Sequence, residues 1–170
     1  MELSKSRIVN CHSRRKSLKL IALGLIAPGL VAFARSARAA THVLKVYKNP
    51  SCGCCNAWID HMRNAGFQVV AKDTTDLRQI KNQLGIFSEL RSCHTGVIDG
   101  YVIEGHVPAK EVARLLRERP NAIGLAVPGM PVGSPGMENK NRQDPFQVIL
   151  FSRERISVYA TYHSQNGTET

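Results

Sequence analysis

The sequence lacks the short motifs by which the common classes of catalytic domain are found. It has no P-loop, no dinucleotide-binding fingerprint, no Ser/His/Asp hydrolase signature and no carboxylate pair set out for acid–base catalysis. It has no internal repeat, and no basic stripe interleaved with aromatic residues follows the N-terminal segment. These absences argue against a nucleotide-dependent enzyme, a hydrolase and a nucleic-acid-binding domain.

Acidic residues are scarce, but the imbalance belongs mainly to one end of the chain. The 170 residues include 23 Lys and Arg against 13 Asp and Glu, a net charge of +10. Residues 1–39 hold eight of the basic and one of the acidic side chains, which leaves 15 against 12, or +3, for the remainder. The basic isoelectric point is therefore no argument for a nucleic-acid partner.

No apolar run is long enough to favour a membrane-spanning helix. The run 20–33 is short and contains Gly and Pro, and it lies between a basic segment and Ala37-Arg38-Ala39, a small-x-small cleavage site. We expect residues 1–39 to be an export signal peptide, with no stable membrane anchor after cleavage. Arg14 and Arg15 stand in a segment that resembles the twin-arginine export signal, so the expected location is the periplasm.

Three of the five cysteines are packed into four positions, directly before a helix-like segment. A thiolate at the start of a helix lies beside unpaired backbone N–H groups and the positive end of the macrodipole, which lowers its pKa. Cys52 and Cys55 are three apart and share one face, whereas Cys54 is turned by roughly 100° from Cys55. One pair could close on itself as a redox dithiol, and the third sulfur could reach elsewhere.

Hydrophobic periodicity and turn signals predict one α/β domain over residues 40–163, with 164–170 as a disordered tail. The expected order is β-α-β-α-β-β-α, followed by a Pro/Gly/Met loop at 123–144 and a β-hairpin. The expected strands are 43–47, 67–71, 95–98, 101–104, 146–151 and 156–160. Two expected helices are 56–66 and 108–120. A third expected helix, between the second and third strands, has Leu77, Ile80, Leu84 and Phe87 on its apolar face.

This order, with a cysteine pair at the start of the first helix, resembles the thioredoxin fold. Cys52-Gly53-Cys54-Cys55 aligns with the thioredoxin Cys-Gly-Pro-Cys, and Cys54 replaces the proline. Cys93-His94-Thr95 falls where thioredoxins carry a cis-proline followed by Thr, so His94 stands in the proline's place. Both departures replace an inert residue by a metal ligand, which favours a soft-metal site on this scaffold over ordinary disulfide exchange.

The candidate metal ligands combine thiolate, imidazole and thioether groups. This mixture favours Cu(I) over hard ions, whereas zinc would be satisfied by four Cys and His ligands and would not need Met. Two of the candidates are methionines in Pro-Gly turns rather than in periodic segments, which argues against a place in the core. The candidates are Cys52, Cys54, Cys55, Cys93, His94, His106, Met130 and Met137, whereas His42, His61 and His163 are expected at the surface.

Four separated segments together resemble the CopG-type copper-resistance proteins, a periplasmic family distinct from the DNA-binding repressors of the same name. The segments are Tyr47-Lys48-Asn49-Pro50-Ser51-Cys52-Gly53-Cys54-Cys55, Cys93-His94-Thr95, Gly105-His106-Val107-Pro108, and Val127-Pro128-Gly129-Met130-Pro131 through Gly136-Met137-Glu138. The resemblance covers roughly residues 43–162. It implies a thioredoxin-like core, a cysteine-rich metal site and copper handling in resistance operons.

Three classes of function remain open at this level. The first is a copper-binding protein that holds Cu(I) and works with other periplasmic copper-resistance proteins. The second is a redox enzyme that uses Cys52 and Cys55, alone or coupled to Cu(I)/Cu(II) interconversion. The third is a thiol–disulfide oxidoreductase acting on proteins, which Cys54 and the missing cis-proline disfavour.

Overall fold

The computed structural model describes residues 42–164 of the chain, where helices and strands follow each other in the order expected from the sequence, with one additional short strand. The predictions for residues 1–39 and for most of the tail lie outside the described residues. The elements are β1 (Val43–Lys48), α1 (Gly53–Asn64), β2 (Gln68–Asp73), α2 (Leu77–Gln83), the 3-10 turn η1 (Ser88–Leu90), β3 (His94–Ile98), β4 (Tyr101–Glu104), α3 (Ala109–Glu118), β5 (Gly124–Ala126), β6 (Phe146–Phe151) and β7 (Ile156–Tyr162).

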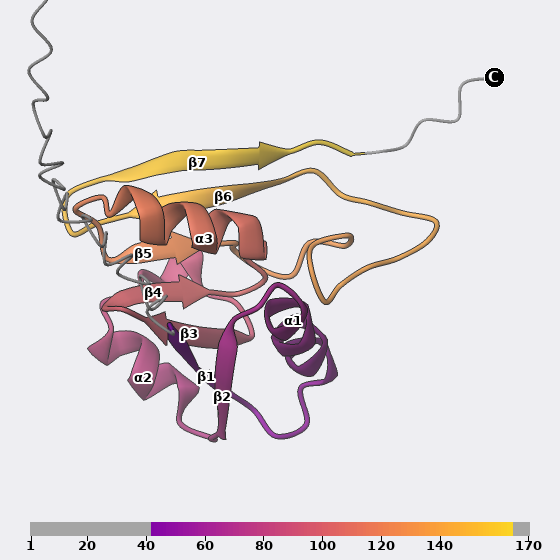
Figure 1. The fold of residues 1–170 in the computed structure, drawn as a ribbon, viewed down its shortest axis with the longest axis horizontal. Helices are drawn as coiled ribbons and strands as arrows, with labels where there is room; N and C mark the ends of the chain where they lie inside the picture. The colour runs from indigo at the N-terminus through magenta and orange to yellow at the C-terminus, as the bar shows by residue number, and fades with distance from the viewer. Residues whose placement is uncertain (1–41, 165–170) are drawn as a thin grey trace, which may run out of the picture. The chain divides into compact units, whose positions relative to one another are not determined.

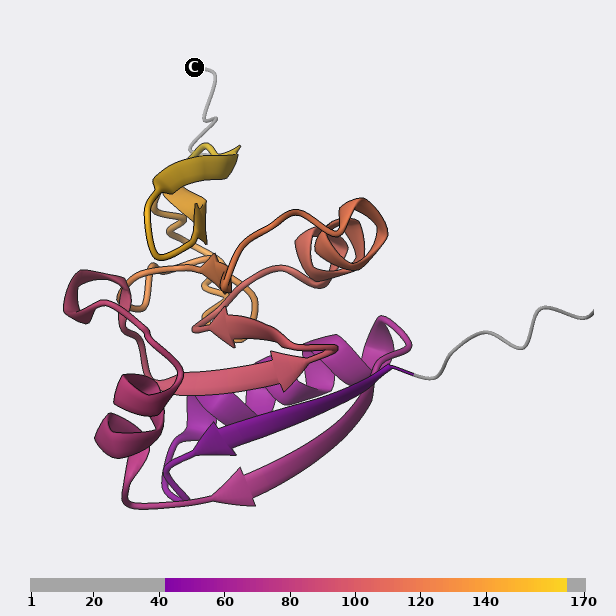
Figure 2. The same ribbon diagram turned by 90° about the vertical axis from the view of Figure 1, so that its left-hand side faces the viewer.

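The strands of residues 42–164 all belong to one mixed sheet with the order β2-β1-β3-β4-β5-β6-β7 (Figures 1 and 2). β1 pairs parallel with β2 and antiparallel with β3, and β3 pairs antiparallel with β4, which is the arrangement of a thioredoxin-like core. β5 pairs parallel with β4, and the β6–β7 hairpin follows it antiparallel. The C-terminal hairpin therefore extends the thioredoxin-like sheet instead of forming a separate unit.

Helices cover both faces of this sheet because its strands are apolar on both sides. The larger core cluster joins residues of α1 and α3 to the strands, including Trp58, Met62 and Leu115, all 0% exposed. The smaller cluster lies on the other face, where Ile86 and Leu90 beside α2 pack with Phe151. Figure 1 shows α1 and α2 on opposite sides of β1 and β2.

Two details of the sequence-based prediction are wrong. The stretch 124–126, expected within a loop, forms the short strand β5, because it pairs with β4 and β6 and is buried. α2 ends at Gln83, so Phe87 is not on its face; Gly85 has φ +71°, a left-handed conformation that ends the helix. The buried residue of α2 is Lys81, not one of its apolar residues.

The long loop between β5 and β6 packs against the start of α1 (Figure 1). A Cβ on Gly136 would lie 2.6 Å from the backbone N of Trp58 and 2.9 Å from the carbonyl O of Cys54. Gly136 also has φ +83°, so glycine is needed for both conformation and space. The loop is thus held against the helix turn that carries the cysteines.

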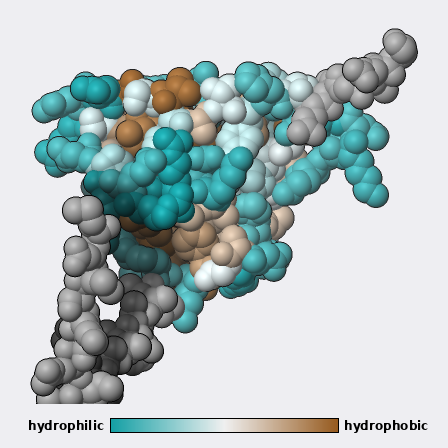
Figure 3. All heavy atoms as spheres, turned by 45° about the horizontal axis from the view of Figure 1, so that its top comes forward, coloured by the Kyte–Doolittle hydropathy of each residue, from teal (hydrophilic) through white to brown (hydrophobic). Residues whose placement is uncertain are grey.

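The face of the molecule drawn in Figure 3 is mainly hydrophilic. Figure 3 shows one face on which hydrophobic residues gather in a few patches among polar ones. The large hydrophobic residues with the greatest exposure are Val43, Val70, Met130, Ile156 and Val158. Among the helices of residues 42–164, none has the length and hydrophobicity needed to cross a membrane.

Candidate metal centre

The first arm of the site is the turn that leads into α1. Cys52 is the N-cap residue of α1, and its side chain makes no capping hydrogen bond. Cys52 and Cys55 are joined by a disulfide, as their three-residue spacing allowed. Cys54 remains a thiol, with its Sγ 3.5 Å from Sγ of Cys52. The arm therefore combines a disulfide and a free thiol within one helical turn.

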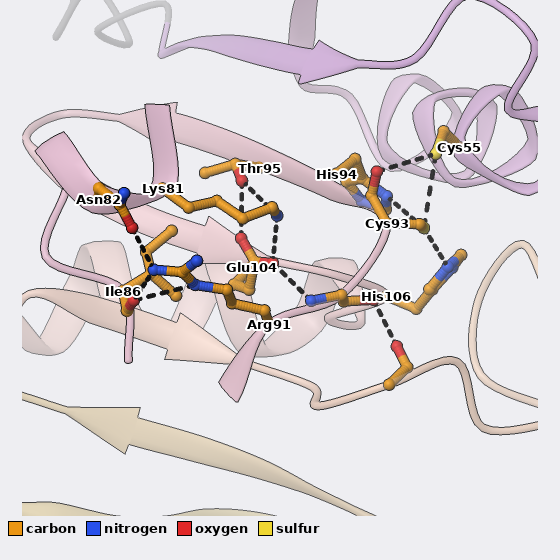
Figure 4. Close-up of polar contacts among 12 residues, drawn as sticks. Cys55, Lys81, Asn82, Ile86, Arg91, Cys93, His94, Thr95, Glu104 and His106 are labelled. Carbon is orange, nitrogen blue, oxygen red and sulfur yellow. Dashed lines mark hydrogen bonds and ion pairs between the residues drawn. The ribbon is translucent and has the colours of Figure 1, made fainter. Parts of the chain in front are cut away.

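The second arm is the segment that enters β3, where the thiol of Cys93 occupies the centre of the site (Figure 4). Its Sγ lies 3.4 Å from Sγ of Cys55 and 3.8 Å from Sγ of Cys54. It also lies 3.1 Å from Nε2 of His106 and 3.3 Å from Nδ1 of His94. Cys93 thus belongs to both an all-sulfur group and a Cys/His group.

Burial raises the pKa of the Cys93 thiol to about 12, and the neighbouring Cys54 adds to this rise. At neutral pH the metal-free side chain is consequently a neutral thiol. A bound cation would favour the thiolate, so that binding would release a proton.

His106 follows β4 and is fully buried. Its Nδ1 lies 2.8 Å from the carbonyl O of Pro135, and because a carbonyl can only accept, Nδ1 carries the hydrogen. Burial lowers the pKa of His106, while the bond to Pro135 and the charge of Glu138 oppose this effect. The neutral ring therefore presents the Nε2 lone pair to Cys93, and a carbonyl of the β5–β6 loop fixes its orientation, as is common for ligating histidines.

His94 is the first residue of β3 and is also fully buried. Its ring lies between those of Trp58 and His106, with centroid distances of 4.4 and 5.0 Å. Burial lowers its pKa well below the ordinary value of 6.5, and the repulsion that a protonated His94 would meet from His106, were that ring also protonated, and from Lys81 acts in the same direction. Among residues 42–164, its Nε2 is the one buried side-chain nitrogen or oxygen without a hydrogen-bond partner.

Beside the site lies a buried polar network that the sequence reasoning missed. Glu104, 0% exposed, accepts hydrogen bonds from Lys81 Nζ, from Thr95 Oγ1 at 2.7 Å and from the backbone N of Ser92 at 2.6 Å. Burial raises the pKa of Glu104, whereas Lys81 and the hydrogen bonds act in the opposite direction. Two features of the sequence could have indicated these buried charges. Lys81 stands on the apolar face of its helix, and Glu104 ends the otherwise apolar strand of Tyr101, Val102 and Ile103.

The structure brings six of the eight candidate ligands together. The ligand atoms of Cys52, Cys54, Cys55 and Cys93 lie within 4.8 Å of one another, and those of Cys93, His94 and His106 form an overlapping group. Met130, 52% exposed, and the half-buried Met137 lie on the β5–β6 loop, and their role as ligands stays a prediction.

One histidine outside the site is not the free surface residue that was expected. His61 is half-buried, and its Nε2 accepts a hydrogen bond of 3.0 Å from the backbone N of Ala109, the first residue of α3. Its role in this structure is to join α1 to α3.

Known proteins provide an independent comparison with this geometry. A family described as "Protein of unknown function, DUF411" matches residues 90–137, which include Cys93, His94, His106 and both loop methionines. Two solved structures of copper resistance protein CopG, Form 2 and Form 1, are each 48% identical to this chain, with TM-scores of 0.69 and 0.68. Each covers 71% of this chain, and the chain covers 98% and 97% of them. The chain belongs to the CopG-type copper-resistance family. No curated protein matches significantly.

The donor set of this CopG-type chain fits a soft metal. Sulfur dominates it, and the imidazole of His106 is held by its hydrogen bond to the carbonyl of Pro135, with its other nitrogen facing Cys93. The unpartnered Nε2 of His94 adds a second buried nitrogen that no protein group satisfies. The site is therefore able to hold a metal ion with ligands from three separate segments of the chain.

Proposed function

We propose that this chain is a periplasmic copper-binding protein of metal resistance that holds Cu(I) through Cys52, Cys54, Cys55 and Cys93, with His94 and His106 completing the site. The observation that carries the proposal is the convergence of four cysteine sulfurs within 4.8 Å of one another, with Cys93 shared by the histidine group. The CopG structures, described as copper resistance proteins, support copper as the cargo.

The chemistry of the donors favours Cu(I) over the alternatives. Thiolates are soft ligands, and Cu(I) binds them in preference to the carboxylate and carbonyl oxygens that hard ions require. Zinc is the main competitor, since four Cys and His ligands are enough for it. The central position of Cys93, within reach of sulfur on one side and nitrogen on the other, also suits a bridging thiolate that serves more than one copper ion.

Copper binding by all four sulfurs requires that the disulfide be reduced. A disulfide sulfur is a far poorer ligand than a thiolate, so Cys52 and Cys55 become ligands only after the disulfide has gained two electrons and opened to two thiolates. In the oxidised protein, Cys54 and Cys93 are the two remaining thiols among residues 42–164. Metal affinity and thiol oxidation are therefore linked in this proposal.

The same linkage supports a second function, a change in the oxidation state of copper. The disulfide can accept two electrons from two Cu(I) ions, with two protons taken up, to give two thiols and two Cu(II) ions; the reverse reaction reduces Cu(II). The contact of 3.4 Å between Sγ of Cys55 and Sγ of Cys93 favours this candidate, because it puts the disulfide next to a proposed copper ligand. A role in disulfide exchange with protein substrates is less favoured, since Cys54 and His94 stand where the thioredoxin pattern has inert prolines, and both are potential metal ligands.

The test of copper binding is an anaerobic titration of the reduced protein, residues 40–170, with Cu(I) in competition with a chelator of known affinity. We expect tight binding, weaker binding of zinc, and X-ray absorption dominated by sulfur scatterers. Cys93→Ser should weaken binding strongly, whereas the control His163→Ala, an exposed position, should not. Copper surrounded only by nitrogen and oxygen would refute the proposal.

The redox function is tested by mixing the reduced protein with Cu(II) under anaerobic conditions and measuring Cu(I) formation and thiol loss. The function requires one Cu(I) per electron drawn from the dithiol and a much slower reaction for Cys52→Ser. Equal rates for the two proteins would leave a passive copper-binding protein.

The periplasmic location rests on the N-terminal sequence. The basic segment, the short apolar run and Ala37-Arg38-Ala39 predict a mature chain that begins at or near Ala40. Mass spectrometry of the exported protein tests this prediction. A cellular protein that keeps the intact segment 1–39 would contradict the predicted cleavage. Replacing Arg14 and Arg15 by Lys should block export if the twin-arginine route is used.

A further inference from the structure

We propose that Glu104 is a positioning residue of the metal centre: it holds the segment before Cys93 and thereby sets the thiol against His106. The copper readout of this inference rests on the proposed function, and a second readout does not.

The need for such a residue follows from the way β3 and β4 separate. The paired register of these strands ends at Thr95 and Glu104, and one further backbone bond, from Gly105 N to His94 O at 3.1 Å, closes the ladder. Cys93 and His106 both lie beyond this point, yet Cys93 Sγ and His106 Nε2 are 3.1 Å apart. Something other than the ladder must keep these two segments together.

The carboxylate of Glu104 makes that connection. It lies two residues before His106, and it accepts the backbone N–H of Ser92, the residue directly before Cys93, at 2.6 Å. The Ser92 hydroxyl donates in turn to the carbonyl of Gly129, and the Gly129 N donates to the carbonyl of Arg91 at 3.2 Å. Figure 4 shows the hydrogen bonds of Glu104 beside the Cys93–His106 contact. One side chain thus ties the entry to β3 to the exit of β4.

Lys81 and Thr95 determine the orientation of this carboxylate. Lys81, 5% exposed, donates to Glu104 and, at 2.9 Å, to Thr95 Oγ1, which donates to the second carboxylate oxygen. A buried ion pair is weak evidence for stability, because apolar residues of similar volume often serve the fold equally well. What apolar residues would not provide is the acceptor for Ser92, so this hydrogen bond is the specific contribution of Glu104.

Two double variants separate positioning from packing. Lys81→Met/Glu104→Gln and Lys81→Met/Glu104→Met both remove the charge pair and keep unbranched side chains, but only Gln offers Ser92 an acceptor. We expect the Met double variant to bind Cu(I) about 10- to 100-fold more weakly, the usual effect of losing an outer-shell partner, while the Gln double variant stays close to wild type. A core variant, Leu115→Ala, controls for destabilisation at a distance from the site.

The second readout uses the reduced, metal-free protein and needs no copper. The rate at which iodoacetamide alkylates Cys93, mapped by mass spectrometry, should rise in the Met double variant and remain at the wild-type value in the Gln double variant. Equal affinities and equal alkylation rates for the two double variants would overturn the proposal. If the wild type fails to bind Cu(I), the proposed function is wrong, but the alkylation rates still decide the role of Glu104.

A backbone substitution covers the case in which the Met double variant does not fold. Ser92→Pro removes the N–H that Glu104 accepts, whereas Ser92→Ala removes only the hydroxyl. The inference requires faster alkylation of Cys93 and weaker Cu(I) binding for Ser92→Pro than for Ser92→Ala. The same values for both would contradict it.

Discussion

Acid should destabilise the metal-free, oxidised protein partly through His94. Its pKa is lowered well below 6.5 in the folded state, first by burial and then by His106 and Lys81. Below pH 6.5 the unfolded chain therefore binds a proton that the folded chain does not, and the free energy of unfolding falls as the pH falls. The stabilisation is present above pH 6.5 and is lost progressively below it.

The magnitude follows from the linkage relation. One group that is protonated only in the unfolded state changes the free energy of unfolding by up to about 1.4 kcal/mol per pH unit. The loss accumulates below pH 6.5 at no more than this slope, for as long as the pH stays above the pKa of the folded state. His94→Leu removes the titrating group and the unpartnered Nε2, so its stability should depend on pH less steeply by about this amount.

The assay is urea denaturation of the chelator-treated, oxidised protein at pH 6.5 and at about pH 4.5. Trp58, the single tryptophan of the chain, reports unfolding by fluorescence, and its ring contacts that of His94, with a centroid distance of 4.4 Å. Carboxylates titrate in the same range, so the quantity of interest is the difference between wild type and variant. His163→Leu, at an exposed position, should keep the wild-type profile. Parallel profiles for wild type and His94→Leu would refute the argument.

Three further outcomes are expected. The apparent Cu(I) affinity of the reduced wild-type protein should rise between pH 6 and 8, by up to about tenfold per pH unit for each proton released on binding. The rise should be less steep for Cys93→Ser, because the pKa of Cys93 is raised to about 12 and this thiol must lose its proton to bind copper. Calorimetry in two buffers of different ionisation enthalpy checks the number of protons released. Gly136→Ala should lower the free energy of unfolding by about 1–3 kcal/mol, because the residue has φ +83° and a Cβ would meet α1; an unchanged denaturation midpoint would contradict this. Met130→Leu and Met137→Leu should weaken Cu(I) binding modestly and leave thermal unfolding unchanged, and a large loss of stability would show that the loop methionines serve packing.

The helices and strands that could be predicted from the sequence are those marked by local patterns. The helix α1 could be predicted because its buried residues Cys55, Ile59 and Met62 recur at helical spacing. Gly66, with φ +91°, follows the end of the helix. The β3–β4 hairpin was readable from Asp99-Gly100, both with positive φ, as its turn type requires. The strand β5 could not be predicted, because three residues beside a Pro/Gly-rich loop are too few to show a hydrophobic periodicity. Their strand conformation comes from pairing with β4 and β6.

The candidate site shows the same division between local and long-range information. The sequence by itself determined the cysteine cluster and its place at a helix start, because residues three positions apart on one turn are neighbours in any helix. Only the tertiary structure decided that Cys93 lies between Cys55 and His106, since these residues meet through strand pairing and not through sequence spacing. It also decided that Lys81 is buried, because its charge is satisfied by Glu104 from a different element, and no local pattern records a partner 23 residues away.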